Sequence, residues 1–561
     1  MFLKWKFPFK VVSHKIASRW LQPIVLAFLA ALSLLLMRPH VVGSWGDDTT
    51  YLIAAKSLAG GHGYHLISWP AAPILTKYPP LFPALLSFIW RLVPRFPDLI
   101  LFCKLLNIAL TLLALNMLYL LARRAFSLPR SLAAMLCLFV GSNATWLSVT
   151  LEVMSEPLYL VLTLSALYFA MKHKAGWHGA PQSLQAAGTG VQDISPWKKH
   201  LFCLVVLSVL AFYTRTIAIS LMGALGVWML QEKQGKHWWV LYWGGCVVLC
   251  LGWILWSMQG HVPVSRIGNF YVYAYNQSYF QEWWLNSVGR QGILSLVGVT
   301  VQALPNALFH LILPFNLPET SPATTSTASL FIHGVLLSGF VAGVVWLAKR
   351  SENAKLLGYY VFFYLLLLFV WSSPEQASRL LVCIFPIIAL LVFQLLQRRK
   401  ATILAIALTM LSLACNLVSF KPISLAPSNQ ETLSRTMSPE LWEDYQATFK
   451  AIREKSPSNA IVWARPDGLL FLHTGRRTVN FQITPASSYF RAEPAENIRQ
   501  LLAITGGQLQ KSRARYILLE PYFMAQQPVD ALIVDWIRLH RDRFKKVYTS
   551  PHHQLFVYRV L

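Results

Sequence analysis

Two adjacent carboxylates stand in the first polar segment that follows an apolar run. Asp and Glu number only 23 in 561 residues, and Asp47 and Asp48 lie together just before a helix-like stretch, LIAAKSLAGG. An aspartate in this place can simply cap the helix that follows it. It can also act as a general base that takes a proton from an attacking hydroxyl, and we expect partial burial near lipid to raise its pKa toward a useful range.

A second pair of carboxylates, Glu152 and Glu156, occurs in a short polar segment where Pro157 begins the next apolar run. Glu156 stands where a negative charge would stabilise the positive end of a helix. The alternative is that Glu156 lines the same cleft as Asp47, where it would bind substrate hydroxyls or assist the base.

Basic residues also lie in the polar segments or at the ends of apolar runs: Lys77, Arg215, Arg266, Arg290 and Arg379. Arg215 has an apolar context, AFYTRTIAIS, and Arg379 begins an apolar run. An arginine at membrane depth is costly and marks a functional site by default, and its guanidinium fits the oxygens of a phosphate. For Arg379 the alternative is a side chain that reaches out to the lipid headgroups.

Other chemistries have little support in the sequence. His62 and His65 follow the two aspartates, but their spacing is not diagnostic of a metal site, so a divalent metal is left open. The sequence has no Gly-rich loop of the ATPase kind, no His-Glu-x-x-His and no Gly-x-Ser-x-Gly. All seven cysteines fall inside apolar runs, so we expect neither disulfides nor a Cys-based zinc site.

The segments that must position these residues are strongly apolar. The chain is 55% hydrophobic and only 13% charged, which is too apolar for a soluble protein. A helix needs roughly 20 residues to cross the bilayer core. Apolar runs of about this length lie near 20–37, 98–121, 131–150, 157–171, 201–214, 217–231, 238–257, 329–348, 355–371, 379–397 and 401–419. We therefore expect a polytopic α-helical membrane protein with about eleven spans.

The positive-inside rule sets the orientation of these spans. With a cytoplasmic N-terminus and an uncleaved first helix, the inside segments hold Arg123, Arg124, Arg130, Lys172, Lys174, Lys198, Lys199, Lys233, Lys236, Lys349, Arg350, Lys355, Arg398, Arg399 and Lys400. The outer loops are then 38–97, 151–157 and about 258–328. The short apolar segment 81–93 has prolines on both flanks, so we expect an interfacial juxtamembrane helix there, and likewise at 290–315.

The composition changes after the last apolar run. Residues 1–420 form the membrane module, whereas 421–561 are more polar and predict a small α/β domain on the outside, with strand-like runs at 459–464, 477–482, 514–519, 545–549 and 554–559. The net charge is +26, and the inside loops explain much of it. Basic residues on the outside suit anionic membrane lipids or a phosphate substrate. Nucleic acid is not an expected partner, because no basic, aromatic-rich soluble module is visible.

Taken in order, these segments resemble the GT-C superfamily of membrane glycosyltransferases, and most of all the group that holds bacterial aminoarabinose transferase and protein mannosyltransferases. The resemblance spans roughly residues 20–400, and each motif alone is weak. Its motifs are Asp47-Asp48-Thr49-Thr50-Tyr51, Lys77-Tyr78-Pro79-Pro80-Leu81, Ser155-Glu156-Pro157, Tyr213-Thr214-Arg215 and Ser378-Arg379-Leu380-Leu381. The C-terminal domain is loosely similar to soluble tails on some members of the superfamily.

The resemblance implies an inverting transfer of a sugar from a polyprenyl-phosphate donor to an extracytoplasmic acceptor, which is a lipid, a glycan or a protein. It implies that Asp47 is the general base and that Glu156 helps to bind or orient the acceptor. Asp48 is a further catalytic candidate, as an alternative place for the base. Lys77, Arg215 and Arg379 would hold the donor phosphate. The remaining candidates for substrate binding are Arg266, Tyr51 and His65.

The resemblance further implies a bacterial cytoplasmic (inner) membrane location. The second acid of the first motif is Asp48 instead of Glu, the second-loop acid is Glu156 instead of Asp, and the late motif lacks its Tyr. These departures leave the sugar and the acceptor unassigned.

Two other functions remain open at this level. A transporter or flippase for a lipid-linked glycan would favour ionisable residues at mid-span and weak inverted halves, and neither is evident in the sequence. A non-catalytic scaffold of envelope assembly would tolerate the loss of Asp47.

Overall fold

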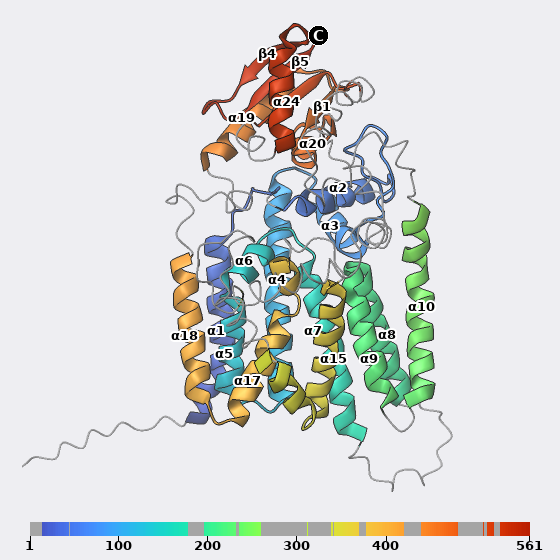
Figure 1. The fold of residues 1–561 in the computed structure, drawn as a ribbon, viewed down its shortest axis with the longest axis vertical. Helices are drawn as coiled ribbons and strands as arrows, with labels where there is room; N and C mark the ends of the chain where they lie inside the picture. Colours follow the sequence, from blue (N-terminus) through green and yellow to red (C-terminus); the bar gives the residue numbers. More distant parts are fainter. Residues whose placement is uncertain are drawn as a thin grey trace, which may run out of the picture.

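The computed structural model describes residues 14–43, 45–177, 196–231, 235–259, 311, 338–339, 341–369, 377–419, 439–480, 509, 513–520 and 528–561. Figure 1 shows two parts: a bundle of long, roughly parallel helices, and a small domain of strands and helices at one end of it. The last strand and the C-terminus belong to the small domain.

The apolar runs of the sequence form the helices of the bundle. They are α1 (His14–Leu36), α4 (Asp98–Leu120), η1 (Leu121–Ala125), α5 (Arg130–Gly141), α6 (Ala144–Thr150), α7 (Glu156–Trp177), α8 (Pro196–Thr214), α9 (Ile219–Leu230), α10 (Gly235–Gln259), α15 (Glu352–Phe369), α16 (Ala377–Leu381), α17 (Phe385–Arg398) and α18 (Thr402–Ser419). Within the described residues, three helices (Asp98–Ala125, Lys236–Gln259 and Glu352–Phe369) are long and apolar enough to cross a membrane, or up to four segments if one bent pair counts as a span. The count of eleven spans stays a prediction.

Two runs that the sequence presents as continuous are broken. Helices α5 and α6 meet at an angle of 67°. The side chain of Asn143 accepts a hydrogen bond from the Trp146 amide, so Asn143 caps a new helix instead of continuing the old one. The run 379–397 is likewise divided into α16 and α17, and Pro386 lies in the first turn of α17, where its missing amide proton costs nothing.

The segment 38–97, which the sequence predicts to be the first outer loop, contains two helices, α2 (Asp47–Ala59) and α3 (Leu81–Leu92). The short segment 81–93 is therefore helical, as expected. Figure 1 shows α2 lying across the bundle, between its end and the C-terminal domain. Helix α3 packs against α2, where the Tyr51 and Phe82 rings meet edge to face with centroids 5.2 Å apart. Apart from Leu311, the segment 290–315 lies outside the described residues.

The C-terminal domain is an α/β sheet with helices. In chain order it comprises α19 (Pro439–Lys455), β1 (Ile461–Ala464), α20 (Asp467–Thr474), β2 (Arg477–Val479), β3 (Tyr516–Leu519), α24 (Pro528–Leu539), η9 (Arg541–Arg543), β4 (Phe544–Thr549) and β5 (Phe556–Val560). The strand order is β2-β1-β3-β5-β4, with β1 parallel to β2 and β3, and β5 antiparallel to β3 and β4. All five strands lie where the sequence predicts them.

The C-terminal domain contacts the first outer loop. The Thr478 amide donates to the Ser68 carbonyl at 2.8 Å, and the Trp69 indole Nε1 donates to Asp467 Oδ2 at 3.2 Å. Arg477 Nη1 donates to the Pro70 carbonyl at 3.1 Å. These bonds fix the domain at several points. They hold the N-terminal end of α20, at Asp467, against the loop that carries α2.

His473, near the end of α20, is enclosed by aromatic rings from both parts of the protein. Its ring centroid lies 4.8 Å from that of Phe96 in the first outer loop and 4.8 Å from that of Phe449 in α19. Burial, reinforced by the positive charge of Arg453, lowers the pKa of His473 to about 4. The folded protein therefore holds this imidazole neutral where an unfolded chain would begin to protonate it.

We expect acid to destabilise the protein through His473. The unfolded chain binds the proton more tightly than the folded protein does. The contribution of His473 to the free energy of unfolding is therefore fully present above about pH 6.5, and up to about 3 kcal/mol of it is lost as the pH drops toward 4. His473→Phe keeps the ring packing and should remove this loss, as measured by thermal unfolding of the intact protein from pH 7.5 to 4.5. The exposed His553, changed to Gln, is the matched control. An unchanged pH dependence in His473→Phe would contradict the assignment.

Candidate active site

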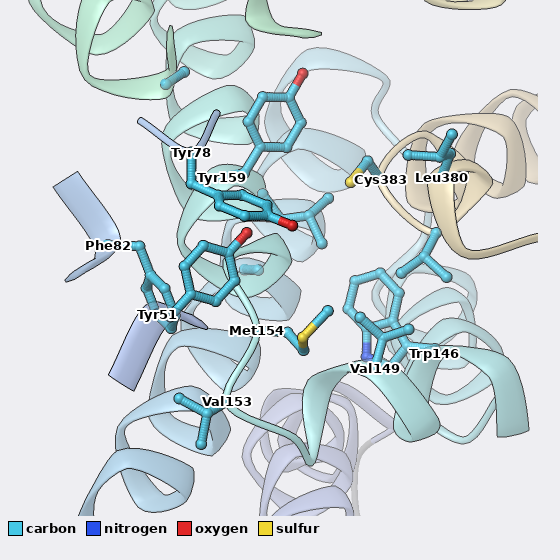
Figure 2. Close-up of a cluster of buried hydrophobic side chains, with 14 of the residues drawn as sticks. Tyr51, Tyr78, Phe82, Trp146, Val149, Val153, Met154, Tyr159, Leu380 and Cys383 are labelled. Carbon is cyan, nitrogen blue, oxygen red and sulfur yellow. The ribbon is translucent and has the colours of Figure 1, made fainter. Parts of the chain in front are cut away.

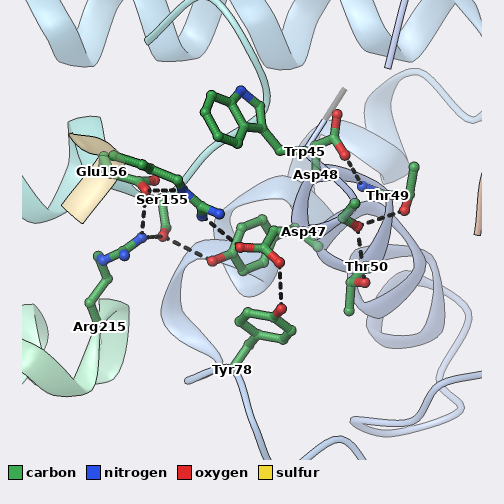
Figure 3. Close-up of polar contacts among 12 residues, drawn as sticks. Trp45, Asp47, Asp48, Thr49, Thr50, Tyr78, Ser155, Glu156 and Arg215 are labelled. Carbon is green, nitrogen blue, oxygen red and sulfur yellow. Dashed lines mark hydrogen bonds and ion pairs between the residues drawn. The ribbon is translucent and has the colours of Figure 1, made fainter. Parts of the chain in front are cut away.

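The carboxylate of Asp47 is held from two sides at the start of α2. Gly46, with φ of 73°, turns the chain into the helix in a conformation that suits glycine. The Tyr78 hydroxyl donates to Asp47 Oδ1 at 2.5 Å, and Arg379 Nη2 donates to Oδ2 at 2.6 Å. Figure 3 shows the Tyr78 hydroxyl pointing at this carboxylate.

The pKa of Asp47 is lowered and not raised, contrary to the expectation from the sequence. Burial does oppose the charged form, but the positive charge of Arg379, with the hydrogen bonds from Tyr78 and Arg379 and the charge of Lys77, outweighs it and holds the pKa of Asp47 below its usual range. The sequence does not reveal this balance, because Arg379 lies far away along the chain. In this arrangement Asp47 is ionised and able to accept a proton.

Glu156 is the second carboxylate of the site, at the first turn of α7. Its side chain is completely buried. Oε1 accepts a hydrogen bond from Arg379 Nε at 3.0 Å and forms an ion pair with Arg215 Nη1 at 2.8 Å. Within the described part of the chain, no group donates to the buried Oε2. A buried oxygen without a donor gains from any hydroxyl group that enters the site and donates to it.

Arg379 joins the two carboxylates. Its Nη2 contacts Asp47 and its Nε contacts Glu156, and the central carbon of the guanidinium lies 5.2 Å from the centroid of the Trp45 ring. The side chain is 6% exposed. A guanidinium suits this role because its planar fork bonds in several directions at once.

Tyr51 and Ser155 complete the polar network. The Tyr51 hydroxyl and Ser155 Oγ are 3.0 Å apart, and Arg215 Nη1 donates to the same Ser155 oxygen at 3.0 Å. The motifs quoted above contain Tyr78 and Ser155, but no role was expected for either. Their only sequence signal is that each adjoins a charged candidate, Lys77 or Glu156.

Apolar side chains surround this network. Figure 2 shows the Tyr51 and Tyr78 rings beside Phe82, with Met154 and Cys383 nearby, all of them buried. Such packing keeps water away, and charges interact more strongly where water is excluded. The charged groups around Asp47 and Glu156 can therefore interact strongly with a charged ligand bound at the site.

Asp48 is turned away from Asp47. It is buried, and its oxygens accept from the backbone amides of Gly43 at 2.7 Å and Thr49 at 2.8 Å. Burial raises the pKa of Asp48, although these bonds and the charge of Lys104 oppose the rise. Lys104 itself lies 2.7 Å from Glu152 Oε2, so Asp48 belongs to a separate buried charge cluster (Figure 3 shows its direction).

The other candidate residues are only partly brought together. Lys77 is close enough for its charge to act on Asp47. His65 Nδ1 lies 2.8 Å from the Ala72 carbonyl within its own loop, and no described contact joins His65 to Asp47 or Glu156. Arg266 lies outside the described residues.

Across the described ranges, no three His, Cys, Asp or Glu side chains cluster as metal ligands. Asp47 and Glu156 are each paired with arginine, which does not fit a divalent cation between them as they stand. We derive no step through a metal ion.

Solved structures with the same fold exist, although no protein-family model and no curated protein sequence matches the chain. The archaeal oligosaccharyltransferase AglB from Archaeoglobus fulgidus, in complex with an inhibitory peptide and a dolichol-phosphate, superposes with a TM-score of 0.52 at 12% identity over 96% of this chain and 74% of AglB. ArnT from Cupriavidus metallidurans in the apo state superposes with a TM-score of 0.52 at 12% identity over 97% of this chain and 98% of ArnT. The chain thus has the fold of GT-C glycosyltransferases, which confirms the resemblance at the level of fold.

Proposed function

We propose that this protein is an inverting glycosyltransferase that moves a sugar from a polyprenyl-phosphate donor to an extracytoplasmic acceptor. The observation that carries the proposal is the bridge from Arg379 to Asp47 and Glu156, in a fold shared with AglB and ArnT. This bridge places a carboxylate that can accept a proton, Asp47, beside arginines whose charge suits a phosphate. The dolichol-phosphate in the AglB complex supports a lipid-phosphate donor.

The proposed reaction is a single displacement. An acceptor hydroxyl attacks the anomeric carbon, its oxygen bonds to that carbon, and its proton passes to Asp47. The bond between the anomeric carbon and the lipid phosphate breaks at the same time, and its electron pair leaves with the phosphate. Lys77, Arg215 and Arg379 stabilise the charge that develops on this leaving group.

Arg379 also explains how a strongly paired carboxylate can act as a base. With no donor present, Arg379 neutralises Asp47 and keeps its pKa low. A bound phosphate competes for the same guanidinium and weakens its pairing with Asp47, so the carboxylate becomes more basic when the donor is in place. Glu156 stays paired with Arg215 and directs its unused oxygen toward an acceptor hydroxyl.

The proposal includes an arrangement in the membrane. Residues 1–420 form a multi-pass module in the bacterial inner membrane with a cytoplasmic N-terminus, and 421–561 form an extracytoplasmic domain. The positive-inside pattern supports this orientation. The apolar helices of the bundle support a membrane location.

Donor recognition can be tested without knowledge of the acceptor. Undecaprenyl phosphate, titrated into the purified protein in nanodiscs of neutral lipid, should raise the thermal unfolding midpoint as a ligand of the folded state does. Lys77→Met should weaken this binding about tenfold, because a phosphate loses one charged partner. Lys349→Met, an exposed lysine outside the site, should bind as the wild type does. Equal stabilisation by uncharged undecaprenol would refute a phosphate site.

A further inference from the structure

Helix α20 of the C-terminal domain approaches α2 so closely that only glycine fits between them. A Cβ atom placed on Gly468 would lie 2.6 Å from Thr49 Oγ1, 3.0 Å from Thr49 Cβ and 3.2 Å from Ile53 Cδ1. Contacts under 3.0 Å are essentially never seen for real Cβ atoms. Any larger residue at this position must therefore push α2 away or displace α20.

Thr49 connects this contact to the catalytic end of α2. Its hydroxyl donates to the Gly46 carbonyl at 2.8 Å, and the Thr50 hydroxyl donates to the same oxygen at 3.2 Å. Asp47 lies between these residues in the first turn of the helix. A displacement of Thr49 therefore moves the turn that presents the Asp47 carboxylate.

Contacts on both sides of Gly468 hold α20 in place. Asp467 Oδ2 accepts from the Trp69 indole, and the Lys56 ammonium of α2 lies 4.8 Å from the centroid of the Phe471 ring. Gly468 and Phe471 are three positions apart and lie on the same side of their helix, so one face of α20 meets α2 along its length. This face is buried and is not free for another ligand.

We propose that Gly468 is a positioning residue: through Thr49, the C-terminal domain sets the place of Asp47 relative to Arg379 and Tyr78. The contacts it protects are short, 2.6 Å from Asp47 Oδ2 to Arg379 and 2.5 Å from Oδ1 to Tyr78. A shift of a few tenths of an ångström weakens such bonds and misplaces a base. The catalytic consequence rests on the proposed function, whereas the mechanical coupling of α20 to α2 does not.

The substitution Gly468→Ala separates this role from a general one in folding. Alanine is a better helix former than glycine, so the change should strengthen α20 taken alone. Any loosening of α2 must then come from the contact with Thr49. The double variant Gly468→Ala/Thr49→Ala removes the hydroxyl that lies closest to the new methyl group, so it should recover most of what the single variant loses.

The test is hydrogen–deuterium exchange of α2 in the full-length protein, together with transfer kinetics. In Gly468→Ala and Gly468→Val, the amides of the first turns of α2 should exchange about tenfold faster than in the wild type, and the double variant should largely restore them. The kcat should fall about tenfold with little change in KM for the donor, since the base is moved and the phosphate site is not. Ser456→Ala is the control, because it removes two side-chain hydrogen bonds of the C-terminal domain, to Ile452 and from Arg476, that do not involve α2.

Unchanged exchange of α2 in Gly468→Val would overturn the proposal. Equal loosening in Ser456→Ala would also overturn it, because α2 would then respond to any weakening of the domain. If exchange responds as expected and the wild type transfers no sugar, the positioning of α2 stands and the proposed glycosyltransferase function fails.

Discussion

Arg379→Met is expected to destabilise the folded protein and to abolish transfer. The substitution leaves the carboxylate of Glu156, which is completely buried, without one of its two arginines, and leaves that of Asp47 without its only described ion pair. Removing one partner from a buried ion pair typically costs about 3–5 kcal/mol. The same change removes the cation that would balance the leaving phosphate.

Thermal unfolding in detergent measures the stability effect, and Arg399→Met provides the matched control. Arg399 is exposed and stacks on the Trp346 ring away from the site, so its loss should change stability little. Arg379→Lys keeps the charge but cannot fork between two carboxylates, so its stability should lie between wild type and Met. A Met variant as stable as wild type would mean that the bridge does not form.

Asp47→Asn is expected to lower kcat by roughly 10²–10⁴-fold, which is the range for loss of a positioned general base. Asparagine has the same shape and can still bond to Tyr78, so the fold should survive. Binding of undecaprenyl phosphate should become tighter, because Arg379 no longer has the Asp47 charge to neutralise. This opposition between donor binding and turnover distinguishes a lost base from a damaged site.

Asp48→Asn is the matched control for that variant. Asp48 accepts two backbone hydrogen bonds and lies outside the Arg379 network, so its replacement should lower stability more than kcat. The ion pair of Asp47 has a pH signature as well. Because its pKa is lowered on folding, its contribution to stability is present above about pH 4 and is lost as the pH falls further. A kcat that falls more in Asp48→Asn than in Asp47→Asn would move the base to Asp48.

Hydropathy and alternation were enough to predict most of the described helices of the bundle and the five strands, because both depend on local periodicity. They could not place the break at Asn143, which depends on one side chain capping the helix that follows. The positive-inside rule predicts that Asp47, Glu156, Arg215 and Arg379 gather on one side of the membrane. The bridging geometry of Arg379 depends instead on how distant segments pack. The lowered pKa of Asp47, and the turn of the buried Asp48 side chain away from Asp47, follow from that packing and not from residue type.

The contact of Gly468 with Thr49 could not be predicted from the sequence at all. A glycine at the start of a short helix has no distinctive local signal, and the two residues come from different parts of the chain. What a sequence of this kind reveals is which residues can do chemistry and on which side of the membrane they gather. Which of them touch is decided by tertiary packing, as the separation of Asp47 from its neighbour Asp48 demonstrates.

The central claim is best tested by following a labelled sugar from lipid to product. Purified wild-type protein would be supplied with a panel of radiolabelled polyprenyl-phosphate sugars and an extract of membrane lipids and glycans, and the anomeric configuration of donor and product would be compared. Product should form with inverted configuration, one polyprenyl phosphate should be released for each sugar transferred, and Asp47→Asn should slow both by roughly 10²–10⁴-fold. Retained configuration, or transfer at the wild-type rate in folded Asp47→Asn, would contradict a single displacement assisted by Asp47.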